Sequence, residues 1–422
     1  MLDIKFIREN KDLIKEASRK KHVDFNVDDL IEADDRRKEF VASIDELRTK
    51  QNKISAEVAQ TEDATIRNGL ILETKSLKEN LQKKEEEFRN IMKGWQSMML
   101  QVPNIPDMSV PEGAGDEDNK EIKKWGEPTQ FSFQPKSHVE LMQNLDMADF
   151  ERGSKVAGFR GYFLKNDGAI LSFAIWQFVL DEVRNKGFNP LITPSIIKKE
   201  PFIGTGYLPQ SEEDLYKTQD DLYLSGTAEV STMGYYMDEV LKKEELPKKF
   251  VSFSPCYRRE AGSHGRDTKG LMRVHEFFKF EQVILCEASH EESVKYHEEL
   301  LANAEGLMQK LGIPYHVVVN CGGDLGLGQV KKYDIEAWVP SEDKYRETHS
   351  ASYFHDFQTR RLNIKYKDEN GKSLFVHSLN NTAIATPRIL ISVIENNQQE
   401  DGSIKIPEVL QKYMGKEIIS KQ

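Results

Sequence analysis

Two stretches near the N-terminus carry apolar residues at the alternating four- and three-residue steps of a helical seam. The first seam consists of Phe40, Ile44, Leu47, Gln51, Ile54 and Val58. The second consists of Leu70, Leu77, Leu81, Lys84, Phe88, Ile91, Trp95 and Met98. Because only a break from Thr61 to Gly69 separates them, the pattern predicts an antiparallel helical hairpin, an arm on the order of 45 Å long at about 1.5 Å per residue. Residues 1–29 predict a short helical lead-in.

Charge is distributed unevenly along this predicted arm. From Arg48 to Lys84 there are eight Lys or Arg residues against five Asp or Glu residues, whereas the base of the arm is acidic. A basic tip on a long lever suits a phosphate backbone. The alternative is a coiled coil that serves only dimerisation and has a solvated polar face.

The segment Val102–Lys120 contains prolines, glycines and acidic residues, and it predicts a linker of about residues 102–120 between an N-terminal domain (1–104, arm about 30–100) and a second domain (105–422). Beyond it the pattern predicts a helix at Ala169–Asn185, another at Asn380–Asn397, and short strands at Gly187–Pro194, Asp221–Leu224, Ile313–Asn320, Tyr333–Val339, Leu362–Lys367 and Leu374–His377. Strands that mostly follow one another favour an antiparallel sheet flanked by helices. We therefore predict an α+β fold with an N-terminal coiled-coil arm.

The stretch Phe250–Glu281 predicts two antiparallel strands joined by a long basic loop, the second strand ending at Glu281. Sixteen residues of it contain Arg258, Arg259, Arg266, Lys269 and Arg273. Arginines on rigid strands grip carboxylate or phosphate oxygens bidentately, so the pattern indicates phosphate chemistry. The alternative is an ordinary exposed hairpin with a solvated basic loop.

Composition narrows the function classes. The 422 residues are 31% charged with a net charge of -11, so any nucleic acid must meet a local basic patch. The N-terminus lacks a signal-like apolar core and no long apolar run follows, which predicts a cytoplasmic protein without a membrane partner. The three cysteines and ten histidines have no zinc-site spacing, and a phosphate-binding GxxxxGK[ST] loop is absent from the sequence.

Three separated stretches resemble the signature motifs of the class II aminoacyl-tRNA synthetases. KGFNPLITPSI, with Pro194, is similar to motif 1; Phe250–Glu281 is similar to motif 2; and HSLNNTAIATPRILISVIENN, with Arg388, is similar to motif 3. Within the class, the resemblance is to the bacterial-type seryl-tRNA synthetases and spans nearly the full length. It includes TGYLPQ, TAE, REAGSHGRDTKGLMR and ENNQQEDGSIKIPEVL.

The resemblance implies a division of roles for ATP and magnesium. Arg258 would hold the serine carboxylate and the α-phosphate, Arg273 the γ-phosphate, and Arg388 the phosphates from the opposite side, with Arg258 and Arg388 catalytic. Glu260 would accept from the adenine amino group, Phe277 would stack on the ring, and Glu347 and Ser350 would position Mg²⁺. The remaining ATP-binding residues implied by the resemblance are Arg259, Val274, Thr348 and His349.

The resemblance also implies a serine site. Thr227, Glu229, Glu281 and Thr382 would recognise the amino acid, together with Ala228, Arg258 and Asn380. A pocket that buries hydrogen-bond partners for the serine hydroxyl rejects alanine, because those partners are then left unpaired. The alternative is that Glu281 is an ordinary exposed carboxylate at a strand end and that Thr382 only caps the following helix.

Several positions depart from the family's common pattern: Gly226 stands where proline precedes TAE, His349 where a small residue precedes Ser350, Tyr353 where Asn is common, and Asn381-Thr382 where Gly-Ser is common. The threonine keeps a hydroxyl, so serine selectivity is expected to survive. His349, next to the expected metal site, is a candidate for altering ATP affinity.

The expected activity is formation of seryl-adenylate from L-serine and ATP, followed by transfer of serine to the 3′ end of tRNA(Ser), with tRNA(Sec) as a further candidate. The arm and the motif 2 loop, including Arg266 and Lys269, would bind tRNA, and motif 1 would form a homodimer. Two alternative functions are compatible with parts of the resemblance. One is an amino-acid-activating paralogue that loads a carrier protein, and the other is a coiled-coil adaptor on an inactive synthetase body.

Overall fold

The computed structural model describes residues 1–262, 265 and 267–421, and the chain divides into two compact units. The first unit contains residues 1–19 and 23–103, and the second contains residues 20–22 together with the chain from Asn104 onward. In the described residues, no helix has both the length and the apolar character needed to cross a membrane.

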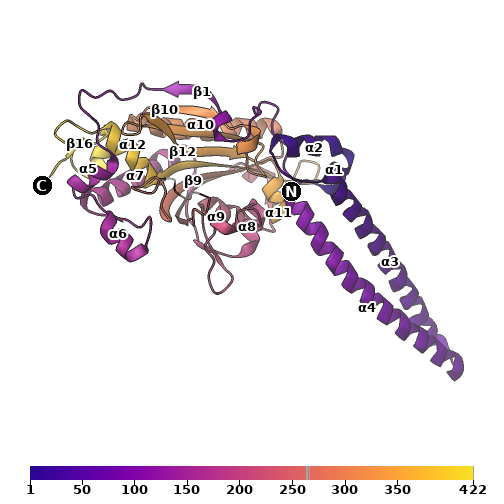
Figure 1. The fold of residues 1–422 in the computed structure, drawn as a ribbon. Helices are drawn as coiled ribbons and strands as arrows, with labels where there is room; N and C mark the ends of the chain where they lie inside the picture. The colour runs from indigo at the N-terminus through magenta and orange to yellow at the C-terminus, as the bar shows by residue number, and fades with distance from the viewer. Residues whose placement is uncertain (263–264, 266, 422) are drawn as a thin grey trace. The chain divides into compact units, whose positions relative to one another are not determined.

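The first unit is built on two long helices that run side by side (Figure 1). They follow two short helices, and the four elements are α1 (Ile4–Glu9), α2 (Lys11–Lys20), α3 (Val27–Gln60) and α4 (Ala64–Gln101). Within the seams, Ile44 and Ile54 are buried, and the Lys84 ammonium lies 4.7 Å from the centroid of the Phe40 ring, which explains how a lysine occupies an apolar position. The helical hairpin is therefore confirmed.

The connection between the two long helices is shorter than the predicted break. The carboxylate of Asp63 accepts from the backbone N–H groups of Thr65 and Ile66, so α4 begins at Ala64 rather than near Leu70. An N-cap of this kind satisfies N–H groups that the helix itself leaves unpaired. Gly69, expected in the break, lies inside the helix.

An eight-stranded sheet forms the second unit. Its order is β1 (Lys120–Trp125), β10 (Tyr315–Val319), β11 (Lys331–Val339), β12 (Lys344–Tyr353), β15 (His377–Thr386), β9 (Glu276–Cys286), β8 (Lys248–Tyr257) and β4 (Asn189–Ile192). All neighbouring pairs are antiparallel except β4 with β8. The predicted antiparallel sheet and the predicted strand pair of the Phe250–Glu281 stretch are both confirmed.

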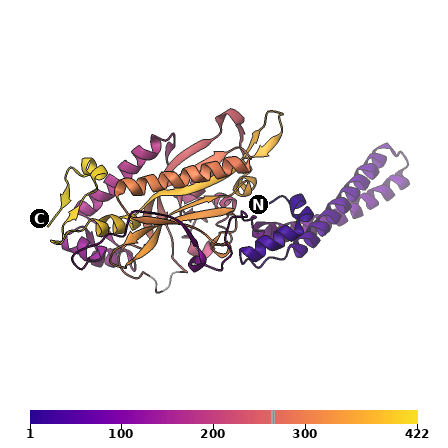
Figure 2. The same ribbon diagram turned by 90° about the horizontal axis from the view of Figure 1, so that it is seen from above.

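Helices cover the sheet, and α10 lies across one of its faces (Figures 1 and 2). Apolar residues of the sheet pack against α7, α10, α12 and α13 in one large core. The helices of this unit are α5 (His138–Asn144), α6 (Phe150–Ala157), α7 (Asn166–Arg184), α8 (Lys199–Thr205), α9 (Ala228–Gly234), α10 (His290–Leu311), α11 (Phe357–Leu362), α12 (Arg388–Asn396) and α13 (Glu408–Met414). Smaller sheets pair β7 (Val240–Lys242) with β13 (Lys365–Lys367) and β14 (Ser373–Phe375), β2 (Ala148–Asp149) with β3 (Phe163–Leu164), β5 (Ile196–Ile197) with β6 (Tyr223–Leu224), and β16 (Ile404–Lys405) with β17 (Ile418–Ile419).

Two further expectations about element boundaries were wrong. Residues 380–386, predicted as the start of a helix, belong to β15, because their backbone pairs with β9 from Asn380 opposite Val283 to Thr386 opposite Phe278. The helix begins only at Arg388, after Pro387. Glu281 does not end its strand either, since β9 continues to Cys286. In both cases long-range pairing overrode the local pattern.

Candidate active site

Two adjoining cavities lie over one face of the large sheet. The larger, of about 380 Å³, is lined by residues that include Tyr207, Glu229, Glu281, Ser350, Asn380 and the loop Gly326–Gln329. The smaller, of about 70 Å³, is lined by residues that include Glu260, Arg273, Val274, Phe277, Thr348 and Arg388. Arg258, Lys279, Glu347 and Thr382 line both. The site therefore joins two chambers through a shared wall of charged and hydroxyl side chains.

Strand alternation explains how β9 supplies this wall. Phe277, Lys279 and Glu281 face the cavities, whereas Phe280 between them packs into the core. Phe278, also between them, lies 5.2 Å from the ring centroid of Trp176 on the opposite face. The aromatic residues fix the strand, and the strand in turn sets the spacing of the charged side chains.

Two buried carboxyl groups and one lysine lie in the larger cavity. The Lys279 ammonium lies 2.7 Å from Glu281 Oε2, and both side chains are buried. Glu229, on α9, accepts from the Gln358 amide at 2.6 Å and from the Tyr207 hydroxyl at 3.0 Å. Burial raises the pKa of Glu229 to about 7, and the nearby Glu281 adds to the shift, while Gln358 and Lys279 oppose it. This end of the cavity thus has two carboxyl groups beside a single ammonium.

Hydroxyl and amide groups of β15 complete the larger cavity. The Thr382 hydroxyl donates to Glu281 Oε2 at 3.4 Å, and Thr382 is directly opposite Glu281 in the strand register. Asn380 lies two residues earlier and lines the same cavity. A carboxylate beside a hydroxyl offers both an acceptor and a donor to a small polar ligand.

Three arginines converge on the smaller cavity from different elements. Arg258, the residue after β8, donates through Nε to the Gly226 carbonyl at 3.3 Å, and its guanidinium carbon lies 5.2 Å from the centroid of the Phe277 ring. Arg388, the first residue of α12, donates to the carbonyls of Met272 and Glu347 at 3.2 and 3.1 Å. Burial lowers the pKa of Arg388 from its usual value.

The third arginine, Arg273, is held by carboxylates of its own hairpin. Its Nε donates to Asp267 at 3.0 Å and its guanidinium reaches Glu260 at 3.4 Å. Arg346 on β12 contacts the same Asp267 carboxylate at 2.7 Å. The three cations are thus preorganised by neighbouring groups, an arrangement that stabilises developing negative charge without reorganising during reaction.

Oxygen groups of β12 lie where the chambers meet. Glu347 lines both cavities, and Ser350, three residues on, lines the larger one. Ser350 is opposite Asp334 in the register of β11 and β12. Burial raises the pKa of Asp334 to about 6, an effect that Lys332 and a hydrogen bond from Ser350 oppose.

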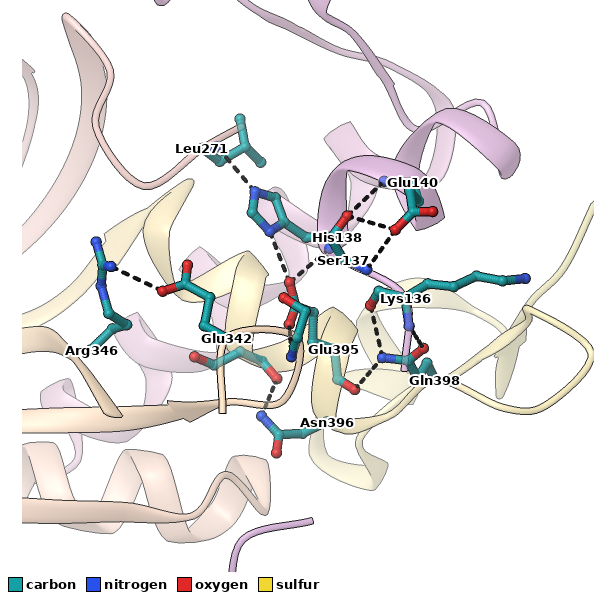
Figure 3. Close-up of polar contacts among 12 residues, drawn as sticks. Lys136, Ser137, His138, Glu140, Leu271, Glu342, Arg346, Glu395, Asn396 and Gln398 are labelled. Carbon is teal, nitrogen blue, oxygen red and sulfur yellow. Dashed lines mark hydrogen bonds and ion pairs between the residues drawn. The ribbon is translucent and has the colours of Figure 1, made fainter. Parts of the chain in front are cut away.

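A hydrogen-bond network behind the smaller cavity connects the motif 2 stretch to α12 (Figure 3). His138 contacts the buried Glu395 carboxylate through Nδ1 at 2.9 Å, and its Nε2 accepts from the Leu271 backbone N–H at 3.2 Å. A Cβ placed on Gly270 would lie 2.3 Å from His138 Nε2. This imidazole positions Leu271 and Met272, which line the cavity.

Some residues implied by the resemblance lie outside both cavity walls. Arg259 donates to the Glu213 carbonyl at 3.1 Å, in the segment before β6. Thr227 is the N-cap of α9, and it and Ala228 are buried. Lys269 belongs to the loop after β8, and Arg266 lies outside the described residues.

The residues that depart from the family's common pattern make specific contacts. The Tyr353 hydroxyl donates to Asp107 at 2.9 Å, and the Asn381 amide donates to the Leu300 carbonyl at 2.6 Å on α10. His349 is buried and bonded to the Ala383 carbonyl. Gly226 offers its carbonyl to Arg258. Of these departures, only Thr382 lines a cavity.

Sequence reasoning missed four groups of this site. Lys279 had a detectable signal, since it lies two residues from Phe277 and from Glu281 in an alternating strand. Tyr207 also had one, since it belongs to the TGYLPQ stretch. Gln358 and the loop Gly326–Gln329 had none, because they come from distant segments. The loop is held by the buried Lys21, whose ammonium donates to the carbonyls of Gly326, Leu327 and Gln329 at 3.0, 2.9 and 2.5 Å.

Comparison with known proteins agrees with this geometry. Residues 1–106 match the seryl-tRNA synthetase N-terminal domain, and residues 212–397 match the class II tRNA synthetase core domain (G, H, P, S and T). The chain is 46% identical to the serine–tRNA ligase of Deinococcus radiodurans over 98% of both chains, and 42% identical to that of Methanocella arvoryzae over 98% of this chain and 99% of the relative.

Solved structures extend the match to the fold. Seryl-tRNA synthetase of Pyrococcus horikoshii, solved with ATP, is 38% identical and covers 100% of both chains with a TM-score of 0.90. The cytoplasmic serine–tRNA ligase of Naegleria fowleri, solved with AMP, is 32% identical, covers 100% of this chain and 99% of its own, and has a TM-score of 0.87. Full-length identity of this degree, both domain matches and the two-chambered site together show that the chain belongs to the seryl-tRNA synthetase family.

Proposed function

We propose that the larger cavity binds L-serine and the smaller one binds ATP, so that seryl-adenylate forms where they meet and serine then passes to the 3′ end of tRNA(Ser). The observation that carries this assignment is Arg258, which lines both cavities. The reaction brings the serine carboxylate against the α-phosphate, two anions that repel each other. A cation common to both chambers neutralises that repulsion. The carboxylate is already ionised, so positioning and electrostatics suffice.

Serine recognition follows from the buried charges. The ammonium of serine would bind Glu229 and Glu281, whose negative charges exceed the single positive charge of Lys279. The hydroxyl would lie between Glu281 and Thr382, with Asn380 beside it. Alanine would leave these buried groups unpaired and is therefore rejected. Thr227 and Ala228 would act through the position of α9.

ATP would use the three arginines and the Phe277 ring. Arg258 would contact the α-phosphate, and Arg273 and Arg388 the remaining phosphates, while Phe277 would stack on adenine and Glu260 would accept from its amino group. Val274 and Thr348 line the same cavity and contribute shape. Arg259 would act indirectly, through its bond to the segment before β6.

Magnesium fits the oxygen groups of β12. Mg²⁺ prefers oxygen ligands and is commonly held by one or two carboxylates together with substrate phosphates. Glu347 offers a carboxylate and Ser350 a hydroxyl oxygen. In the part of the chain that the structure describes, no cluster of three or more His, Cys, Asp and Glu side chains could hold a metal by itself. An Mg²⁺ ion bound with ATP would use Glu347 and Ser350 together with the phosphates. When bound, it would neutralise phosphate charge.

The arm and the motif 2 loop would bind tRNA. The excess of Lys and Arg from Arg48 to Lys84 suits phosphate contacts on the tRNA body, and Lys269 and Arg266 suit the acceptor end. tRNA(Sec) is a further candidate substrate. The place of action would be the cytoplasm, where tRNA charging supplies translation.

A homodimer would form along the β4 edge of the sheet. This edge strand carries Ile192, whose exposed fraction is 88%, and Ile196 is exposed just after it in the chain. Phe163 of β3 and Phe173 of α7 are exposed too. An unpaired strand edge with exposed apolar side chains favours association with another chain. Light scattering of the wild type and of Ile192→Asp tests it: a dimer is expected for the former and a monomer for the latter, and a monomeric wild type contradicts it.

The activity is tested by two assays on the full chain. Serine-dependent exchange of pyrophosphate into ATP measures adenylate formation, and labelled serine with bulk tRNA measures transfer. We expect both, and we expect Arg258→Ala to lose both. Exchange without charging would favour the carrier-loading paralogue, and absence of exchange would contradict the enzyme assignment.

A further inference from the structure

Two β-bulges face each other beside the site. In β12, Ile335 pairs with His349 but Glu336 pairs with Glu347, so Thr348 is an extra residue. In β15, Thr382 pairs with Glu281 but Ile384 pairs with Phe280, so Ala383 is an extra residue. Bulges are frequent next to active sites, where they redirect side chains.

The bulge in β15 decides which side chains face the cavities. Asn380 and Thr382 face the larger cavity in normal alternation, whereas Ala383 and Ile384 both belong to the core. After this shift of one residue, Ala385 faces the smaller cavity. Without the extra residue, strand alternation would turn the segment after Thr382 the other way. The bulge therefore aligns the two chambers along one strand.

His349 connects the two bulges. The ladder between β12 and β15 covers only Ala351 with Asn381 through Tyr353 with Leu379, so these strands are not paired at His349. There the imidazole Nε2 lies 3.0 Å from the Ala383 carbonyl, and Nδ1 lies 2.8 Å from the Thr348 hydroxyl. Since a carbonyl can only accept, Nε2 carries the proton. The Thr348 hydroxyl also lies 3.2 Å from the Ile335 carbonyl of β11, so the contacts of His349 join both bulges.

We propose that His349 is a positioning residue for serine selectivity: by holding the bulged carbonyl of Ala383, it fixes the Thr382 hydroxyl against Glu281. The inference rests on the proposed serine cavity. His349 lines neither chamber and touches no substrate, so its effect passes through the backbone of β15. Without the imidazole, the Ala383 carbonyl loses its donor and the bulge loses its tie to β12. Thr382 then samples orientations that no longer meet the serine hydroxyl.

The test separates serine from ATP in pyrophosphate exchange. His349→Ala is expected to raise the KM for serine about tenfold, about 1.4 kcal/mol, and to narrow the preference for serine over alanine, while the KM for ATP changes less than about twofold. His349→Gln keeps a side-chain donor and is expected to recover part of the loss. In a Thr382→Ala background, the His349 substitution is expected to add little, because both act on one hydroxyl.

His297 provides a matched control. Like His349 it is buried and bonds a backbone carbonyl through Nε2, but its partner is Ala351 of β12 at 2.9 Å, and it lies on α10, outside the cavity walls. His297→Ala is expected to lower the melting temperature without changing the KM for serine. The inference would be overturned if His349→Ala lost only stability, or if it changed the KM for serine and the KM for ATP equally. It would also be overturned if the effects of His349→Ala and Thr382→Ala were fully additive, or if both His349 variants unfolded. If the wild type shows no serine-dependent exchange, the proposed function fails first.

Discussion

Glu229 is expected to make serine binding depend on pH near neutrality. Its carboxylate is buried, and its pKa is raised to about 7 by burial and by Glu281. If the ionised form binds the serine ammonium, the KM for serine should fall as the pH rises toward 8. The sign follows from the charge: a neutral carboxylic acid attracts an ammonium far less than a carboxylate does.

The size of the effect follows from this pKa. At pH 6, about one molecule in ten has Glu229 ionised, so the KM for serine should be about tenfold higher than at pH 8. Glu229→Gln replaces the charged acceptor with a neutral amide, and loss of one hydrogen bond to a charged group costs about 1.5–3 kcal/mol. That cost corresponds to a rise in KM of roughly ten- to a hundredfold. In the Glu229→Gln variant, the KM for serine should no longer depend on pH.

The assay is pyrophosphate exchange from about pH 6 to 8, with serine and ATP varied separately. The KM for ATP is the internal control, because Glu229 lines only the larger cavity. Gln358→Leu provides a second check. It removes the 2.6 Å donor that favours the charged carboxylate, so the midpoint should move to higher pH. A flat KM for serine in the wild type, or an unchanged slope in Glu229→Gln, would refute the reasoning.

Three other perturbations test different parts of the molecule. Gly270→Ala puts a Cβ 2.3 Å from His138 Nε2 at a φ of +77°, so it should lower the melting temperature and raise the KM for ATP. Gly187→Ala is the control, because φ there is +84° but the space is open, and its effects should be smaller. Equal effects of the two substitutions would contradict the importance of the His138 contact. Burial lowers the pKa of His297 and His349 to about 4, below the value near 6.5 that a histidine has in the unfolded chain. The free energy of unfolding measured in urea should therefore be unaffected by these groups above about pH 6.5 and should fall toward pH 4, by up to about 3 kcal/mol for each histidine. Constant stability from about pH 7 to 5 would contradict it. Deleting residues 31–99 should leave exchange nearly intact and abolish tRNA charging, and equal loss of both would contradict a separate arm.

Local pattern was sufficient for the elements whose determinants lie close together in the chain. The two helical seams followed from residue spacing, and the hairpin of β8 and β9 followed from two alternating runs on either side of one basic loop. The family resemblance added the candidate residues, because motif residues keep fixed offsets such as Arg258 to Glu260 and Phe277 to Glu281. Most of those residues line one of the two cavities.

Long-range pairing decided the rest. The segment before Pro387 has apolar spacing compatible with a helix, yet it forms β15 because β9 pairs with it up to Thr386 and β12 pairs with its earlier part, up to Asn381. The environment of Glu229 depends on Gln358, 129 residues away, and the loop Gly326–Gln329 is held by Lys21, about 300 residues away. No local pattern records such partners.

The sequence by itself therefore determined the helical hairpin, the central strand pair and the chemical types at the site. Only the tertiary structure decided that Lys279 neutralises Glu281, that Ala383 is an extra residue in its strand and that His349 holds it. The physical reason is that periodicity reports which face of an element is apolar, whereas register, bulges and the pKa of a buried group depend on which strands and charges are brought together from far along the chain.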